Sequence, residues 1–254
     1  MFLFNLEVCV LNALVFNEFT VTKRYACRYS FIREKYVYEN ETNLENVLIR
    51  GAVTLSGDSL QIPFVVAQTH PLRHEQAARL LAGFHGAAYR TPFTSMDIPK
   101  GKMYVERKLV SLLEEQKGNE TISAILALAL ETCTELVLCH GDFSPRNIIV
   151  GDLERLYLID FEAVTLGPRA FDIAKYLWKC GEDTAVGLDN SVFKTAYEHS
   201  ASCKVSQWEI DIYILVHALL AQKWLRETGV DDPSYHQLAQ RTIAQQVARL
   251  SSDI

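Results

Sequence analysis

The chain has 254 residues, of which 49% are hydrophobic and 22% are charged, a composition that is typical of a folded globular protein and excludes a disordered chain. The length is sufficient for one large domain or for two small lobes with a substantial core. The 25 basic and 31 acidic residues give a net charge of −6, and since no block rich in lysine and arginine is present, no nucleic acid is expected as the main partner.

The cysteines and the N-terminus indicate a cytoplasmic protein. Six cysteines occur, none with CxxC spacing, so we expect buried, reduced thiols and neither a disulfide framework nor a zinc site. The apolar N-terminus lacks an early basic residue and a small-residue cleavage site, so no signal peptide is expected. No apolar run is long enough to cross a membrane. A mildly acidic surface would tolerate a cationic substrate.

The first part of the sequence alternates between apolar and polar residues, as short strands do. Strands are expected at 8–16, 19–25, 47–55 and 60–67. Lys23 lies near the end of the second strand. A helix is expected to begin at Ser30 as its N-cap residue and to run to about Glu39, with Glu34 on its first full turn. This β-β-α-β-β order predicts a small sheet with one helix.

After the fourth strand the sequence becomes helical. Helices are expected at 73–89, 103–117, 122–133, 170–180, 189–200, 206–229 and 233–250. Two of them have clear start signals, since Ser206 begins a capping box and Asp232 is an N-cap residue followed by Pro233. The sequence therefore predicts an α+β fold with a small β-rich lobe at 1–67, a larger helical lobe at 68–254 and a ligand cleft between the two.

A polar loop between apolar runs carries the candidate chemistry. Asp142 and Asn147 lie five positions apart in this loop, after the apolar run 136–139. The two apolar runs that follow are separated by a turn at 151–154, and we expect them to form a hairpin that brings Asn147 beside Asp160. Two oxygen ligands and one free carboxylate at strand ends are what magnesium-assisted phosphoryl transfer requires.

Three segments stand out together: His140-Gly141-Asp142 with Asn147, Ile159-Asp160-Phe161-Glu162, and Gly167-Pro168-Arg169-Ala170-Phe171-Asp172-Ile173-Ala174. They resemble the aminoglycoside phosphotransferase and choline kinase-like family, whose members are small-molecule relatives of the eukaryotic protein kinases. The glycine at the centre of the first segment distinguishes this family from protein kinases, which usually have arginine there. The resemblance covers 136–180 strongly and the remainder through the order of the elements, and it implies a two-lobed protein-kinase-like fold.

The resemblance implies a role for each matching residue. Asp142 would be the catalytic base that orients the substrate hydroxyl and accepts its proton. Asn147 and Asp160 would be the ligands of Mg²⁺. Lys23 would hold the α- and β-phosphates, with Glu34 as its ion-pair partner. Glu39 would replace Glu34 in this role if the helix is rotated or starts later.

The resemblance also implies a nucleotide hinge and two structural residues. The backbone of the segment that begins Val66-Ala67-Gln68 and ends at His70 would bind the adenine. Asp172 would support the backbone of the catalytic loop, and His140 would pack that loop and not carry a proton.

The phosphate-binding part of the N-terminal lobe is shortened relative to the family. The first glycine is Gly51, and only 22 residues precede Lys23, which leaves room for little more than one strand before the lysine strand. Three alternatives would explain this short segment: a truncated chain, a misplaced start, or a very short phosphate loop. Asp160 is followed by Phe161-Glu162 in place of the phenylalanine-glycine of protein kinases, which favours the small-molecule family.

The expected function is transfer of the γ-phosphoryl group of ATP, with GTP as the alternative donor, to a hydroxyl of a small molecule such as an aminoglycoside, choline, homoserine or a sugar. A non-catalytic nucleotide-binding protein and a metal-dependent hydrolase are the alternatives. Arg146 and Ser144 could contact phosphate or substrate, or could form a loop salt bridge and a turn hydrogen bond. Trp208, Tyr213 and Trp224 are expected to pack in the core, although late helices shape the substrate pocket in this family.

Overall fold

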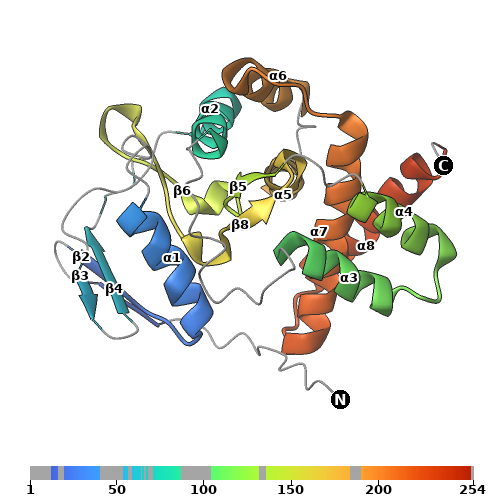
Figure 1. Cartoon of the computed structure of the whole chain (residues 1–254), viewed down its shortest axis with the longest axis horizontal. Coiled ribbons are helices and arrows are strands. Elements are labelled where there is room, and N and C mark those ends of the chain that lie inside the picture. Colours follow the sequence, from blue (N-terminus) through green and yellow to red (C-terminus); the bar gives the residue numbers. More distant parts are fainter. Residues whose placement is uncertain are drawn as a thin grey trace.

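The computed structural model describes residues 13–16, 20–40, 54–56, 59–63, 65, 67, 71–86, 104–131, 136–183 and 190–252. The first elements are β1 (Ala13–Phe16), β2 (Thr20–Arg24), α1 (Arg28–Asn40), β3 (Thr54–Ser56) and β4 (Ser59–Pro63). The expected β-β-α-β-β order is therefore present. The four strands form one antiparallel sheet in the order β1-β2-β4-β3, and α1 lies beside it (Figure 1).

A small core joins this sheet to α1. Tyr25, Phe31 and Leu60 are buried together, and Ile62 packs against them. Lys23 is paired with Leu60 in the ladder between β2 and β4. Because directly paired residues of antiparallel strands project from the same face, the side chain of Lys23 lies on the face of the sheet that packs against α1.

The prediction that Ser30 caps α1 is wrong. The helix begins at Arg28, because the backbone N–H of Phe31 already donates to the carbonyl oxygen of Cys27 over 3.2 Å. Ser30 therefore lies inside the first turn. The buried residues Phe31, Glu34 and Val37 follow at intervals of three, which places one carboxylate on an otherwise apolar stripe.

The second part of the chain is mainly helical. Its helices are α2 (His74–His85), α3 (Tyr104–Glu115), α4 (Glu120–Glu131), α5 (Arg169–Asp183), α6 (Asn190–Ala201), α7 (Gln207–Thr228) and α8 (Pro233–Leu250). Its strands are β5 (Val137–Cys139), β6 (Ile148–Val150), β7 (Leu156–Leu158) and β8 (Thr165–Gly167). The expected hairpin is the antiparallel pair β6 and β7. The antiparallel pairing of β5 with β8 was not predicted, because three residues are too few to show an alternating pattern.

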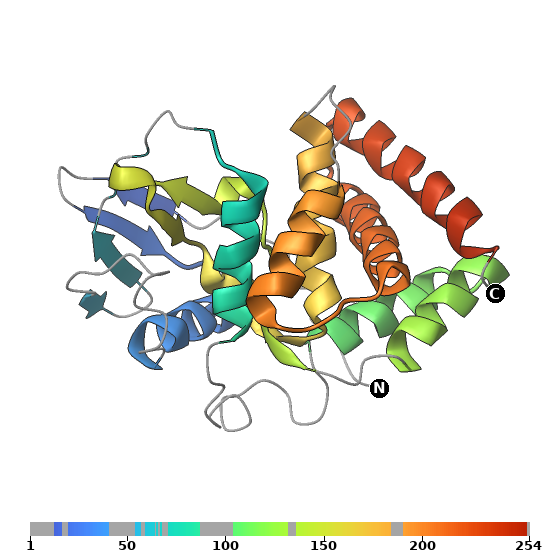
Figure 2. The same ribbon diagram turned by 90° about the horizontal axis from the view of Figure 1, so that it is seen from above.

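Helix α7 lies at the centre of the helical lobe. It contacts α3, α4, α5 and α8, and Figure 2 shows α8 outside it. The expected cap at Asp232 is present, since its carboxylate accepts from the backbone N–H of Tyr235 over 2.9 Å. Ser206 precedes α7 but forms no side-chain cap hydrogen bond, so the capping box is not formed. Within the described ranges, no helix has the length and apolar character needed to cross a membrane.

Candidate active site

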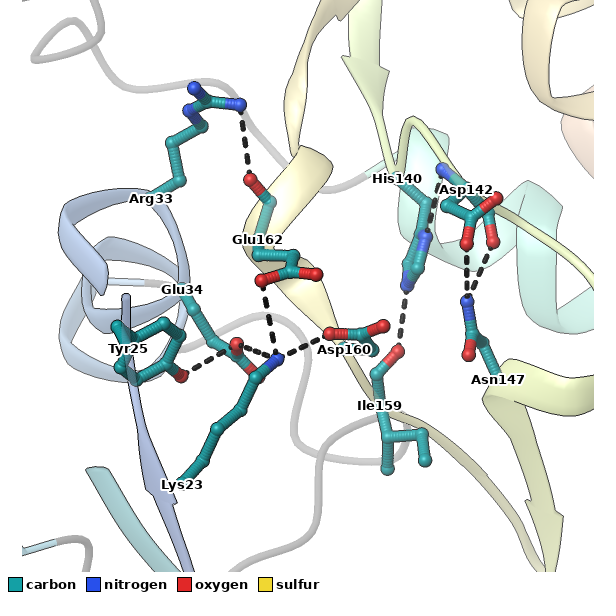
Figure 3. Close-up of polar contacts among 10 residues, drawn as sticks. All are labelled: Lys23, Tyr25, Arg33, Glu34, His140, Asp142, Asn147, Ile159, Asp160 and Glu162. Atoms are coloured by element: carbon teal, nitrogen blue, oxygen red, sulfur yellow. Dashed lines mark hydrogen bonds and ion pairs between the residues drawn. The ribbon is translucent and has the colours of Figure 1, made fainter. Parts of the chain in front are cut away.

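Lys23 lies at the centre of three carboxylates (Figure 3). Its Nζ donates to Glu34 Oε2 over 2.8 Å and forms an ion pair with Asp160. Glu162 Oε2 lies 3.7 Å from the same nitrogen. Since Lys23 and Glu34 belong to the N-terminal sheet and helix while Asp160 and Glu162 follow β7, the structure brings together residues that are far apart in the sequence.

Glu34 is the most buried member of this cluster, with 2% of its surface exposed. It also accepts a hydrogen bond of 2.6 Å from the hydroxyl of Tyr25. Burial by itself lowers the pKa of Lys23, but the carboxylates of Glu34, Asp160 and Glu162 outweigh burial and raise that pKa above its usual value. Burial and the Glu34 carboxylate raise the pKa of Tyr25. Both donors therefore keep their protons.

The loop after β5 carries Asp142 and Asn147. The Nδ2 atom of Asn147 donates to the backbone oxygen of Asp142 over 2.8 Å and to Asp142 Oδ2 over 3.2 Å. The amide oxygen of Asn147 has no hydrogen bond to any described residue. The N–H of Ile159 donates to the carbonyl oxygen of Asn147 over 3.0 Å, which extends the hairpin and places Asp160 beside Asn147 at its open end.

Asp142 has a cationic neighbour that sequence reasoning missed. Lys175, on α5, places its Nζ 2.8 Å from Asp142 Oδ1. Burial by itself raises the pKa of the Asp142 carboxyl, but the charge and hydrogen bond of Lys175 outweigh it and hold that pKa below its usual value. The Asp142 side chain is still 42% exposed, so its carboxylate is accessible from solvent.

Asp172, on the first turn of α5, supports the same loop. Its carboxylate accepts from the backbone N–H of His140 over 2.6 Å and from that of Gly141 over 2.9 Å. Gly141 has φ +83°, and a Cβ atom there would overlap the backbone carbonyl of Ala163. The central position of the His-Gly-Asp segment therefore favours glycine over residues with a side chain, because its φ is positive and no space is left for a Cβ atom.

His140 has the contacts of a structural residue. Its Nε2 donates to the carbonyl oxygen of Ile159 over 2.9 Å, and its Nδ1 accepts from the N–H of Asp142 over 3.3 Å. Its ring packs against those of Phe143 and Phe161, with centroids 6.2 and 5.2 Å away. Both ring nitrogens are engaged, so the geometry favours packing over proton transfer.

A second histidine, His85 at the end of α2, was also missed. Its Nε2 donates to Asp172 Oδ2 over 3.1 Å and its Nδ1 accepts from the hydroxyl of Tyr197 over 2.6 Å. Burial lowers the pKa of His85 despite the hydrogen bond with Asp172, which keeps the imidazole neutral. The sequence contains only a weak indication that His85 is buried, since it continues the apolar stripe of Ala78 and Leu81 at helical spacing.

The expected adenine hinge cannot be followed along its length. Val66 and Gln68 lie outside the described residues, and Ala67 is exposed. The adenine-binding role of Val66, Ala67 and Gln68 therefore stays a prediction.

The model of the phosphotransferase enzyme family (APH) matches residues 55–204. The chain belongs to this family. The match includes the whole catalytic loop, the Asp-Phe-Glu segment and the first turn of α5, which are the segments that carry the sequence resemblance.

Solved structures confirm the two-lobed kinase-like fold of this phosphotransferase family member. Choline kinase LicA from Streptococcus pneumoniae is 18% identical, with a TM-score of 0.68 over 94% of this chain and 90% of that one. The Plasmodium vivax ethanolamine kinase Pv091845 is 15% identical, with a TM-score of 0.62 over 96% and 83% of the two chains. The GDP and kanamycin complex of APH(2")-IIia is 15% identical, with a TM-score of 0.62 over 95% and 89%.

A cavity of about 550 Å³ opens beside the catalytic loop of this phosphotransferase. Asp142, Asn147 and Asp160 line one part of it. Helices α3, α5, α7 and α8 supply another part, with the side chains Lys108, Lys175, Lys179, Trp224 and Tyr235. The expectation that Trp224 packs in the core is wrong, because its side chain is 40% exposed and lines the cavity.

Proposed function

We propose that this protein transfers the γ-phosphoryl group of ATP to a hydroxyl group of a small molecule. The observation that carries the proposal is that Asp142, Asn147 and Asp160 line one cavity while Lys23 forms an ion pair with Asp160. These residues come from both lobes, and phosphoryl transfer depends mainly on positioning and on stabilisation of charge. GTP is a possible second donor.

Asp142 is the proposed catalytic base. In the reaction, the acceptor oxygen forms a bond to the γ-phosphorus while the bond from that phosphorus to the β–γ bridging oxygen breaks. The hydroxyl proton passes to a carboxylate oxygen of Asp142, and the products are ADP and a phosphate monoester. The hydrogen bonds from Asn147 to Asp142 fix the orientation of this carboxylate. Its lowered pKa suits a group that orients the hydroxyl and accepts its proton late in the step.

Lys23 is proposed to hold the α- and β-phosphates. Its ammonium group is positioned by Glu34, and Tyr25 donates to Glu34 from the opposite side. Because Glu34 is buried and already satisfied by two donors, it keeps the ammonium group in place when the phosphates bind. The adenine would lie against the backbone of the hinge at Val66, Ala67 and Gln68.

Asn147 and Asp160 are the proposed ligands of Mg²⁺. The residues fit the ion, because an amide oxygen without a described partner and a carboxylate belong to residues that line the same cavity, and Mg²⁺ prefers oxygen donors. Magnesium, when bound, would neutralise the charge that develops on the transferring phosphates. Asp160 has φ +67°, an uncommon conformation for a residue other than glycine, and such strain is concentrated at functional sites.

The test combines nucleotide binding with turnover. Mg·ATP is expected to raise the melting temperature, and ADP release is expected with at least one acceptor from a panel of aminoglycosides, choline, homoserine, sugars, hydroxy acids and sugar phosphates. Asp142→Ala should abolish transfer and keep the melting-temperature shift, since the base contacts the acceptor and not ATP. A shift without turnover on any acceptor would instead support a non-catalytic nucleotide-binding protein.

A further inference from the structure

Three lysines line the part of the cavity that lies beyond the catalytic loop. Lys108 comes from α3, and Lys175 and Lys179 come from α5. The two lysines of α5 are four residues apart, so they project from the same side of the helix. Three ammonium groups from two helices therefore line this part of the cavity, although the whole chain is acidic.

Lys175 fixes the charge that an acceptor meets at the reacting atoms. Its Nζ lies 2.8 Å from Asp142 Oδ1, and its side chain is only 17% exposed. A hydroxyl that reaches Asp142 therefore lies within a few ångströms of a partly desolvated ammonium group. Lys175 would repel a positive charge on the acceptor near that hydroxyl, whereas it would attract a negative charge there.

Lys179 lies over an aromatic ring of the cavity wall. Its Nζ lies 4.1 Å from the ring centroid of Tyr235 and 4.8 Å from that of Trp178. Aromatic faces are the usual means of binding quaternary ammonium ligands. The ring of Tyr235 lines the cavity and already holds a lysine of the protein, so a ring that could bind a choline-like acceptor instead presents a protein cation there.

The carboxylates that line the cavity already have partners. Asp160 and Glu162 lie within 4 Å of the lysine of β2, and Asp142 contacts Lys175. Asp232 accepts the first backbone hydrogen bond of α8. Each of these carboxylates has a lysine as its electrostatic neighbour, which is Lys179 in the case of Asp232, so a cationic acceptor would compete with a cation of the protein at each of them.

From these contacts we infer that the acceptor is an anion, namely a hydroxylated small molecule that also carries a carboxylate or a phosphate group. The anionic group binds to Lys179 and Lys108, and the hydroxyl lies between Lys175 and Asp142. Trp224 and Tyr235 form the wall along the carbon skeleton. This inference rests on the proposed function, because it names the substrate class of the same site.

Four acceptors that share a 1,2-diol and differ in their third group provide the test: glycerate, glycerol 3-phosphate, glycerol and 3-amino-1,2-propanediol. They are assayed by ADP release with the full chain, together with larger hydroxy acids, sugar phosphates, choline and aminoglycosides. We expect anionic acceptors to give the highest kcat/KM. Comparing kcat/KM for glycerate with kcat/KM for glycerol 3-phosphate shows whether a carboxylate or a phosphate is the recognised group.

Variants of Lys179 connect this preference to the cavity. Lys179→Met should raise the KM of the best anionic acceptor by roughly tenfold to a hundredfold, the usual effect of losing a hydrogen bond to a charged group. The KM of Mg·ATP should not change. Lys179→Glu should lower the ratio of kcat/KM for anionic acceptors to kcat/KM for cationic acceptors more than Lys179→Met does. Lys117→Met is the matched control, because this lysine is 70% exposed and pairs with Glu114 away from the cavity.

The outcomes separate this inference from the proposed function. Preferred turnover of a neutral or cationic acceptor supports the function and overturns the inference, as does an unchanged KM in Lys179→Met. If no compound is phosphorylated, the proposed function fails, and binding decides the inference. If the anionic compounds raise the melting temperature of the wild type but not that of Lys179→Met, the anion site is supported. Equal shifts of the melting temperature in both proteins overturn it.

Discussion

Replacing Lys23 by methionine tests how the buried carboxylate of α1 is stabilised. Methionine keeps much of the packing of the aliphatic stem and removes the ammonium group. Glu34 would then keep only the hydrogen bond from Tyr25 while remaining 2% exposed. Removing one partner of a buried ion pair costs about 3–5 kcal/mol, so we expect the free energy of unfolding to fall by this amount.

The other contacts of Lys23 contribute little to that loss. The side chains of Asp160 and Glu162 are each 32% exposed, so water can replace the ammonium group around them. Glu34→Gln provides the matched variant: it keeps an oxygen that can accept from Tyr25, and Lys23 keeps its other two carboxylates. Loss of one charged hydrogen bond should lower the free energy of unfolding by about 1.5–3 kcal/mol.

The double variant Lys23→Met/Glu34→Gln completes the cycle. Because it leaves no uncompensated charge at the buried position, it should be more stable than the sum of the two single effects predicts, by well over 0.5 kcal/mol, which is the usual limit of additivity for independent sites. Urea denaturation followed by circular dichroism measures the three differences, and ADP release measures transfer. Additive effects would refute this account, as would restored transfer in the double variant, since Lys23 itself is proposed to hold the phosphates.

Three further results are expected. Gly141→Ala should lower the melting temperature and transfer together, because the added Cβ meets the carbonyl of Ala163 at a positive φ; a melting temperature equal to that of the wild type would contradict the geometry. Burial lowers the pKa values of His85 and His217, so below pH about 6.5 the unfolded chain binds protons that the folded chain does not. Stability should then fall with decreasing pH by up to about 1.4 kcal/mol per pH unit for each histidine. His217→Gln should reduce this slope in denaturation experiments between pH 5.5 and 7, and an unchanged slope would contradict it. Asp160→Asn should raise the magnesium concentration needed for half-maximal ADP release, and an unaltered magnesium dependence would argue against its role as a ligand.

The parts of the fold and of the site that depend on local patterns could be predicted from the sequence. The hairpin β6–β7 follows from two apolar runs around a turn, and it brings Asn147 and Asp160 together as expected. The face on which Lys23 lies follows from strand alternation. Both inferences need only a short segment and one period. The pairing of Glu34 with Lys23 was expected only from the family resemblance, with Glu39 as the alternative.

The parts that depend on packing between distant elements could not be predicted. Lys175 and Lys179 look like solvated residues of an amphipathic helix in the sequence, and only the docking of α5 against the catalytic loop brings Lys175 to Asp142. His85 reaches Asp172 because α2 packs beside β5. Trp224 is apolar and lies on a mostly buried helix, so its exposure to the cavity has no local signal.

Helix α5 has a consequence for how new acceptor preferences could arise. Asp172 on its first turn holds the backbone of the catalytic loop, whereas Lys175 and Lys179, one and two turns later, set the charge of the cavity. In the proposed site, support of the catalytic loop and selection of the acceptor would thus lie on successive turns of one helix. Exchanging the second lysine for another residue would retune selectivity without displacing the aspartate that fixes the loop, which makes this helix a natural starting point for redesigning the enzyme.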